Sequence, residues 1–295
     1  MEDAWVDDFI LTYLYARAHA NAYLSHNRNS SQWKNMPFID NDGVRIHYEV
    51  EGDGPPLVLC HGLSLSLEFW RILGYVEALK RNYQLILLDT RGHGNSDKPH
   101  DPEAYSYELM VADVVSILDA LNIEKAHYLG YSMGGYVGWL IGKYAPDRFH
   151  SLIIGGSSPL EQDPDAPDPS IGWWTSLFKQ GNETVITTYE TMMGVEFPPE
   201  AKKVLRNNDP EALIAVLSIL EEQVDYDETI ANATLPCLIY NGEADPHDAN
   251  TKKSMDELPN ATFVTLPGLS HFAGFMQSDL VIPHIQKFLE NMTKT

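Results

Sequence analysis

The chain has 295 residues, of which 44% are hydrophobic and 21% are charged, and this composition is typical of a globular protein. Its formal net charge of −22 argues against nucleic-acid or membrane partners, because both carry negative charge and would repel it. The acidic start MEDAWVDDF lacks the basic residues that open a secretory signal, and no apolar stretch approaches the ~20 residues that span a bilayer. We therefore expect a cytoplasmic protein.

Residues 1–36 are predicted to form an N-terminal extension to the body of the protein. An Ala-rich stretch containing Trp5, Phe9 and Tyr13 is expected to be helical up to about Ser25, followed by the polar linker HNRNSSQ. A helix with so many aromatic residues is expected to bury them against another surface. We expect it to pack on the rest of the chain or on a second subunit, and the second outcome would make a homodimer.

The body alternates between predicted strands and predicted helices. A hairpin around Asn41-Asp42-Gly43 comes first. Near-continuous apolar runs, typical of strands buried on both faces, follow at residues 57–60, 85–88, 126–129, 151–154, 237–240 and 261–265. Helices are predicted between the first four of these, at 69–80, 106–121 and 133–144. This alternation predicts an α/β fold with a doubly wound, mostly parallel sheet.

The alternation stops at residue 158 and resumes at 232. The proline-rich and acidic run EQDPDAPDPS is followed by helical patterns at 171–179, 183–193, 200–206 and 211–224, with no strand-like run between them. We interpret residues 158–231 as a helical cap inserted over the sheet edge. It divides the core into residues 37–157 and 232–295. Cys60 and Cys237 lie in apolar runs and are expected to be buried reduced thiols.

The strongest chemical signal is the pentapeptide GYSMG at residues 130–134. It follows a buried strand directly and precedes a helix directly, which is the context of a nucleophile elbow. In such a turn the hydroxyl of Ser132 projects clear of the sheet, and Gly130 and Gly134 leave room for the turning backbone. The alternative is a tight turn with an incidental serine. The context favours Ser132 as the catalytic nucleophile.

Three further segments end at the same predicted sheet edge. In CHGL, the backbone N–H of Leu63 is expected to join that of Met133 as a donor to an oxyanion, with His61 bracing the loop. His271 in LPGLSHF follows the last strand and is the predicted base. Asp245 in NGEADP follows the preceding strand and is the predicted acid, although Glu243 in the same loop competes with it.

The remaining histidines fit a catalytic role less well, among them His127, His150 and His284. No cluster has the spacing of metal ligands, so neither a metal nor an organic cofactor is predicted.

Together with DTRGHGNSD at residues 89–97, these motifs resemble the α/β-hydrolase superfamily over residues 38–290. They are most similar to its esterase, lactonase and meta-cleavage-product hydrolase branches. The resemblance implies that Asp89, Arg91 and His93 are structural. It also implies an ester hydrolase that works through an acyl-enzyme.

The substrate is expected to be an apolar small-molecule ester or lactone, because apolar side chains of the insertion and of the motif loops could line a pocket. Each of them could instead simply pack the insertion onto the body. They are Leu65, Trp70, Trp173, Trp174, Phe178, Tyr189, Met193 and Phe272.

Three alternative functions stay open. A C–C bond hydrolase would use the same triad, a perhydrolase is a further branch, and a ligand receptor on this fold would keep the triad but turn over slowly. A serine at the elbow argues against haloalkane dehalogenases and epoxide hydrolases, which use an aspartate there.

Overall fold

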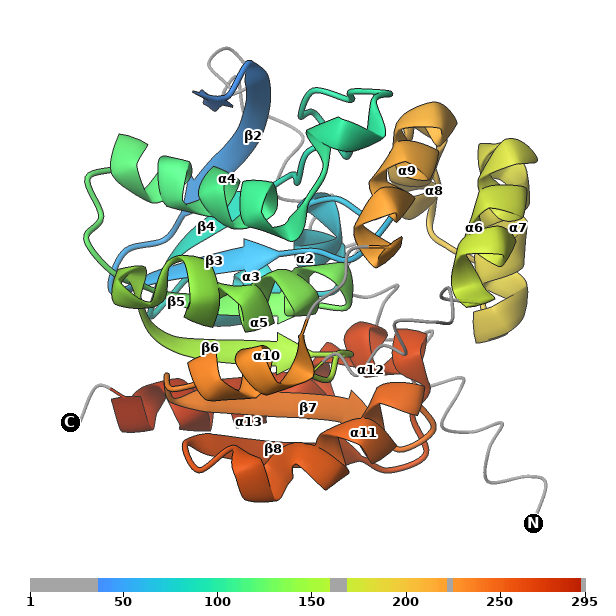
Figure 1. Ribbon diagram of the computed structural model, residues 1–295. Helices are drawn as coiled ribbons and strands as arrows, with labels where there is room; N and C mark the ends of the chain where they lie inside the picture. The colour runs from blue at the N-terminus through green and yellow to red at the C-terminus, as the bar shows by residue number, and fades with distance from the viewer. Residues whose placement is uncertain (1–36, 160–168, 222–224, 293–295) are drawn as a thin grey trace.

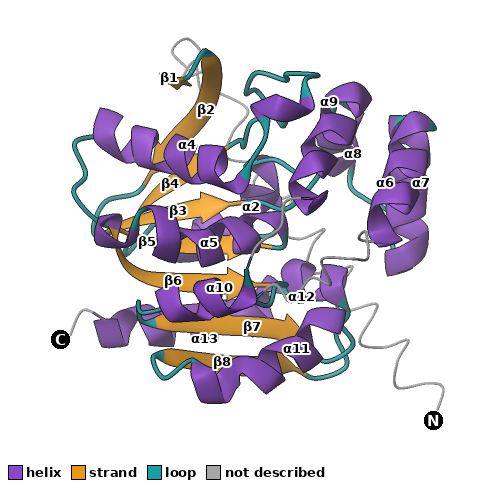
Figure 2. Ribbon diagram, in the orientation of Figure 1, coloured by secondary structure: helices purple, strands orange, loops and turns teal. Residues whose placement is uncertain are grey.

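The computed structural model describes residues 37–159, 169–221 and 225–292. Within these ranges an eight-stranded sheet forms the centre of the molecule, in the order β1-β2-β4-β3-β5-β6-β7-β8. Strands β3 to β8 pair in parallel, and β2 is antiparallel to both β1 and β4. Helices cover both faces (Figures 1 and 2). The predicted α/β fold with a doubly wound, mostly parallel sheet is confirmed, while the predicted extension 1–36 lies outside the described residues.

The hairpin pattern predicts β1 and β2, and the other six strands fall where the apolar runs predict them, although β8 is an edge strand that is only partly buried. Their bounds are β1 Phe38–Asn41, β2 Val44–Glu51, β3 Pro56–Cys60, β4 Gln84–Leu88, β5 Ala126–Tyr131, β6 Phe149–Gly155, β7 Cys237–Gly242 and β8 Ala261–Leu266.

The helices of the body lie in two layers, one on each face of the sheet. They are α2 Glu68–Ile72, α3 Tyr75–Leu79, α4 Tyr107–Ala120, α5 Met133–Tyr144, α10 Tyr226–Asn232, α11 Pro246–Ser254, α12 His271–Met276 and α13 Ser278–Met292. In Figure 1, α4 and α5 lie in front of the sheet, and α3 and α13 lie behind it.

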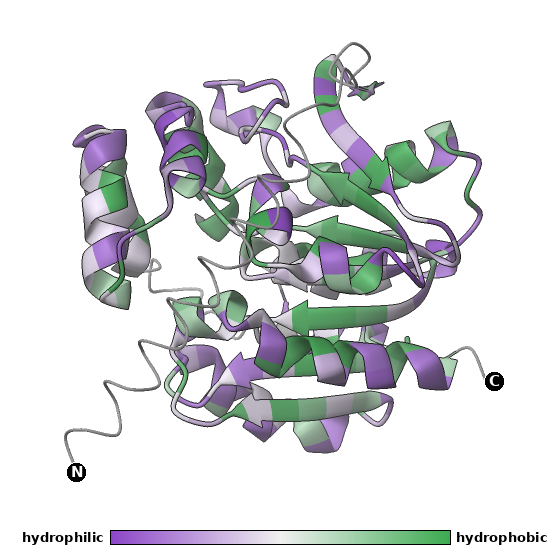
Figure 3. Cartoon of the chain, turned by 180° about the vertical axis from the view of Figure 1, so that it is seen from behind, coloured by the Kyte–Doolittle hydropathy of each residue, from purple (hydrophilic) through white to green (hydrophobic). Residues whose placement is uncertain are grey.

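The period of two along each strand explains why both faces are covered. In β3, Leu57 and Leu59 join one apolar core with α3 and α13, while Val58 and Cys60 join the other core with α4 and α5. Figure 3 shows the resulting pattern: the central strands are hydrophobic along their length, and the C-terminal helix alternates between hydrophobic and hydrophilic residues.

Two local predictions have different outcomes. The hairpin turn is confirmed, since Asp42 and Gly43 both have positive φ (56° and 77°), as a two-residue turn matched to the strand twist requires. The single helix predicted at 69–80 is wrong. Gly74 adopts φ 83° and ends α2, so α3 begins as a separate short helix.

The described residues of the inserted segment are mostly helical, and its last helix, α10, packs on α5 of the body. We call α6 Pro169–Lys179, α7 Asn182–Met193, α8 Pro199–Arg206 and α9 Pro210–Val216 the insertion helices. The predicted helix 211–224 is shorter than expected, because α9 passes into the 3₁₀ helix η4 Leu217–Glu221. Figure 1 shows the insertion helices beyond the carboxyl ends of the parallel strands, where ligands bind in sheets of this kind.

Both cysteines are buried and unpaired by disulfides. Burial raises the pKa of the Cys60 thiol to about 12 and also raises that of Cys237. In the part of the chain that the structure describes, every helix is too short or too polar to cross a membrane.

Candidate active site

The pentapeptide at residues 130–134 forms a sharp turn between β5 and α5. Ser132 adopts φ 55° and ψ −116°, a strained conformation for a residue with a side chain. A Cβ on Gly130 would lie 2.1 Å from the carbonyl oxygen of Gly134, and one on Gly134 would lie 2.3 Å from that of Cys60. Both glycines are therefore required by close backbone approach, and the turn has the geometry of a nucleophile elbow.

The hydroxyl of Ser132 lies 3.0 Å from Nε2 of His271, and Nδ1 of His271 lies 2.7 Å from Oδ2 of Asp245. Ser132 and His271 are 139 positions apart in the sequence. Each of the three residues nevertheless lies at the start of a helix that follows a strand. Ser132 precedes α5, Asp245 precedes α11 and His271 opens α12. The carboxyl edge of the parallel sheet thus brings together the three predicted triad residues.

The second carboxylate of this loop points elsewhere. Oε2 of Glu243 accepts a hydrogen bond from the backbone N–H of Gly268, 2.9 Å away. Asp245 is 3% exposed and is the carboxylate in contact with His271. Of the two acids that the sequence leaves in competition, the geometry favours Asp245.

The electrostatics of Asp245 favour its charged form. Burial alone would raise the pKa of this carboxyl, but the hydrogen bond from His271 and the nearby His271 and His247 rings lower it below the ordinary value. A carboxylate that stays ionised is suited to accept the Nδ1–H of His271 and so to leave Nε2 free to take a proton from Ser132.

The loop after β3 lies against the elbow. A Cβ on Gly62 would lie 3.2 Å from the Cβ of Ser132, so the backbone approaches this serine closely there. Toward the other described residues, the Leu63 N–H makes no hydrogen bond, whereas the Ser64 N–H donates to His93. The Met133 N–H is the first of α5 and has no intrahelical acceptor. Both groups are available as oxyanion donors, and that role stays a prediction.

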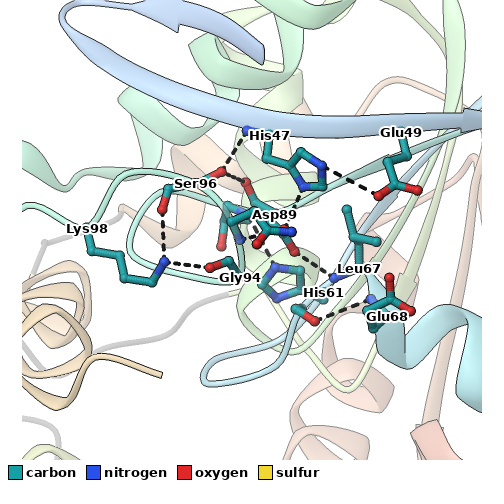
Figure 4. Close-up of polar contacts among 12 residues, drawn as sticks. His47, Glu49, His61, Leu67, Glu68, Asp89, Gly94, Ser96 and Lys98 are labelled. Atoms are coloured by element: carbon teal, nitrogen blue, oxygen red, sulfur yellow. Dashed lines mark hydrogen bonds and ion pairs between the residues drawn. The ribbon is translucent and has the colours of Figure 1, made fainter. Parts of the chain in front are cut away.

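Asp89 holds the loop after β3 in place, as Figure 4 shows. Its carboxylate accepts from Leu67 N and Asn95 N, each at 2.9 Å, and contacts Nδ1 of His47 at 2.8 Å. Its backbone carbonyl accepts from Ser96 Oγ. A single buried carboxylate therefore ties the end of β4 to β2 and to the loop that carries Leu63, which agrees with the structural role that the resemblance implies.

Two histidines complete this bracing. His61 accepts from Thr90 N through Nε2, and His93 accepts from Ser64 N through Nε2 at 3.0 Å. Both are fully buried, and burial lowers the pKa of both rings, that of His93 to about 3. They are therefore neutral acceptors that shape the loop, as expected for His61.

An unbroken series of rings leads from the insertion helices to the triad. Trp173 meets Trp174 edge-on at 4.7 Å between centroids, and Trp174 meets Tyr189 at 6.2 Å. The ring centroid of Phe272 lies 5.2 Å from that of Tyr189 and 5.7 Å from that of His271. Because Trp173 is 44% exposed, the series runs from solvent to His271.

The other predicted pocket residues lie deeper or to the side. Trp70 has no exposed surface and packs edge-on against Phe275, so it belongs to the core beneath the site. Phe178 is 1% exposed and stacks on the ring series. Leu65 and Met193 are half-buried and pack against the same apolar cluster.

Tyr131 is a neighbour of the triad that the sequence prediction missed. It is buried, stacks on Phe275 at 4.8 Å, and donates its hydroxyl hydrogen to the carbonyl oxygen of His271. A residue of the elbow thereby anchors the backbone of His271, the predicted base. The signal was available, because Tyr131 is the second residue of the pentapeptide.

His247 also lies beside the triad and was not singled out from the sequence. Its backbone N–H donates to Oδ1 of Asp245, and its ring lies 5.7 Å from that of His271. Nitrogen and oxygen atoms of Asp245, His247 and His271 fall within 4.8 Å of one another, a juxtaposition that sequence spacing does not reveal. The ring nitrogens of His247 contact Tyr136 Oη at 3.2 Å and Ser158 Oγ at 3.3 Å, so both already face hydrogen-bonding groups.

Residues 55–232 match the family model described as the alpha/beta hydrolase fold. This match covers more than half of the chain, and the sheet order and elbow agree with it. The protein belongs to the α/β-hydrolase fold family.

Similar proteins differ in the reactions that their names give. The 3-oxoadipate enol-lactonase 1 of Acinetobacter baylyi is 29% identical over 228 residues, which cover 73% of this chain and 82% of that protein. Mouse epoxide hydrolase 4 is 36% identical over 119 residues, covering 39% of this chain and 32% of that protein. Mouse bifunctional epoxide hydrolase 2 is 32% identical over 124 residues, which cover 42% of this chain but only 22% of that protein.

A solved structure reported for carboxylesterases of the thaumarchaeon Nitrososphaera gargenis matches with a TM-score of 0.75 at 20% identity, covering 88% of this chain and 99% of that one. At this identity the likeness concerns the fold.

Proposed function

We propose that the protein hydrolyses carboxylic esters of apolar small molecules through an acyl-enzyme on Ser132. One observation carries this proposal: the continuous hydrogen-bonded series from Ser132 through His271 to Asp245, with distances of 3.0 and 2.7 Å. A serine hydroxyl is a weak nucleophile at neutral pH, and a neighbouring base backed by a buried carboxylate is the standard way to activate it.

The reaction would proceed in two steps. His271 takes the proton of Ser132 as its oxygen attacks the ester carbonyl, and the N–H groups of Leu63 and Met133 stabilise the oxyanion. The tetrahedral species collapses, the alcohol leaves with the proton from His271, and the acyl group stays on Ser132. Water then attacks the acyl-enzyme with His271 again as base, which releases the acid and restores the serine.

The identity of the elbow residue argues against epoxide opening despite the epoxide hydrolases among the similar proteins. Epoxide hydrolases of this superfamily alkylate an elbow aspartate, and this chain has Ser132 there. A serine bonded to a histidine is suited to acyl transfer.

The ring series between Trp173 and His271 supports an apolar or aromatic substrate. Aromatic walls favour apolar groups by burying them from water and by ring contacts. A lactone is the second candidate, because it is an internal ester open to the same triad and because the relative from Acinetobacter baylyi is an enol-lactonase.

Steady-state hydrolysis of p-nitrophenyl esters of graded chain length tests the proposal, with an aromatic lactone assayed beside them. Ser132→Ala should abolish turnover, and Ser176→Ala, which changes an exposed serine in α6, should leave it unchanged. Multiple turnovers that survive Ser132→Ala would contradict the proposal. A single acylation followed by arrest would favour the receptor alternative over an enzyme.

A further inference from the structure

Ser64, the residue after the predicted oxyanion donor Leu63, is held in an unusual conformation. It lies in the loop between β3 and α2, has no exposed surface and adopts φ 63°. A side chain disfavours this left-handed region, so surrounding contacts must impose the conformation.

Three hydrogen bonds surround Ser64, and two of them come from the inserted segment. Its carbonyl oxygen accepts from Nδ2 of Asn208 at 2.7 Å, and its hydroxyl lies 2.7 Å from that of Tyr189. Its backbone N–H donates to Nε2 of His93 in the body at 3.0 Å. Asn208 and Tyr189 are more than 120 positions away in sequence, so the contacts join two distant parts of the chain.

The partners on the insertion side are themselves fixed. Asn208 lies between α8 and α9 and is 8% exposed. The side chain of Asn182, at the start of α7, donates to the carbonyl oxygens of Arg206 and Asn208 and so sets the path of that loop. Tyr189 is 2% exposed and packs on Phe272, beside His271.

We propose that Asn208 and Tyr189 are positioning residues that hold the Ser64 backbone so that the neighbouring Leu63 N–H faces the oxyanion at Ser132. The insertion helices would then complete the catalytic geometry of the body as well as cover it. This inference rests on the proposed function, because it concerns the oxyanion of that reaction.

The close contact of the loop with the elbow explains why small shifts matter. Gly62 lies against the Cβ of Ser132, only two residues before Ser64. Losing a full oxyanion donor typically costs about 10²–10³ in rate, since the donor must meet the charge that develops in the transition state. A displaced donor should cost less than an absent one but should still act on the chemical step.

The test measures the labelling of Ser132 by an alkyl fluorophosphonate. The serine oxygen bonds to phosphorus, fluoride leaves, the proton passes to His271, and the phosphoryl oxygen occupies the place of the oxyanion. The maximal labelling rate reports the chemical step, and the concentration at half-maximal rate reports prior binding. This probe needs no knowledge of the natural substrate.

Asn208→Ala and Tyr189→Phe are compared with matched controls. Asn260→Ala removes an exposed Asn whose side chain bonds the carbonyl oxygen of Thr234 at the amino ends of β7 and β8, away from the carboxyl ends that hold Ser132. Tyr105→Phe removes a phenol hydroxyl that bonds the carbonyl oxygen of Pro99. We expect Asn208→Ala and Tyr189→Phe to lower the maximal rate about tenfold or more, with half-saturation changed less than about twofold. The controls should stay within about twofold of the parent in both, and thermal unfolding will identify any variant that misfolds.

Equal maximal rates for Tyr189→Phe, Asn208→Ala and the parent would overturn the inference and leave the proposed function intact. A change confined to the probe concentration at half-maximal rate would also overturn the inference, because it would mark the two residues as binding groups. A parent that is never labelled at Ser132 would overturn the proposed function, and this inference with it.

Discussion

Replacing Asp245 by Asn separates the charge of the triad acid from its shape. Asp245 is 3% exposed, and both of its carboxylate oxygens are engaged, Oδ2 with His271 Nδ1 and Oδ1 with the backbone N–H of His247. An amide oxygen can keep the bond to His247. The amide nitrogen would then face Nδ1 of His271 and force the imidazole proton onto Nε2, where it blocks proton transfer from Ser132.

The expected loss follows from that tautomer change. The corresponding substitution in a serine protease lowers kcat about 10⁴-fold, and at 1.36 kcal/mol for each tenfold this equals about 5 kcal/mol of transition-state stabilisation. We expect a loss of this order in kcat for Asp245→Asn. The fold should be little affected, because the residue keeps its volume and its bond to the start of α11.

The assay is kcat for p-nitrophenyl ester hydrolysis, with thermal unfolding as the check on folding. Glu243→Gln is the matched control, since Glu243 is in the same loop but bonds Gly268 N. It should keep kcat within about twofold. The reasoning fails if Asp245→Asn retains more than about a tenth of parental kcat, or if Glu243→Gln loses as much as Asp245→Asn.

Three further predictions concern buried groups. Asp113→Ala leaves the Arg91 guanidinium buried without its charge partner, so urea unfolding should show a loss of about 3–5 kcal/mol; a loss below 1 kcal/mol would contradict this. Burial raises the pKa of Asp89, but hydrogen bonds from a histidine and two backbone N–H groups outweigh it and lower the pKa. Its stabilising contribution should therefore be complete above about pH 4 and disappear as pH falls through the lowered pKa, so urea midpoints that stay constant from pH 7 to 3 would refute it. Iodoacetamide at pH 8 should spare Cys60 and Cys237 in the native protein and modify both in urea, as intact mass will report.

The sequence predicts the sheet well because strands buried on both faces need uninterrupted apolar runs, as in residues 57–60 and 85–88. It fails at Gly74, where one glycine inside an apolar helical pattern ends α2, because a pattern does not distinguish a tolerated glycine from a terminator. The meeting of Ser132, Asp245 and His271 follows from a rule of topology: the carboxyl ends of parallel strands share one edge, so residues after different strands meet there.

Other features of the site depend on packing that no local pattern encodes. Trp70 and Phe272 are both aromatic and were both predicted to line a pocket. Only the packed fold shows that Trp70 lies in the core and Phe272 lies beside His271. The contact between Asn208 and Ser64 spans 144 positions and depends on how the insertion helices rest on the body. Long-range polar contacts of this kind carry no periodic signal in the sequence.

The most direct test of the account is the location of the covalent intermediate. The protein is mixed with a p-nitrophenyl ester, quenched with acid during turnover and digested, and the peptides are analysed by mass spectrometry. The account predicts one acyl group, added with release of p-nitrophenolate, on the hydroxyl of Ser132, and none at this site in Ser132→Ala. An acyl group on another residue that forms at the rate of turnover, or turnover without any acylated Ser132, would contradict it.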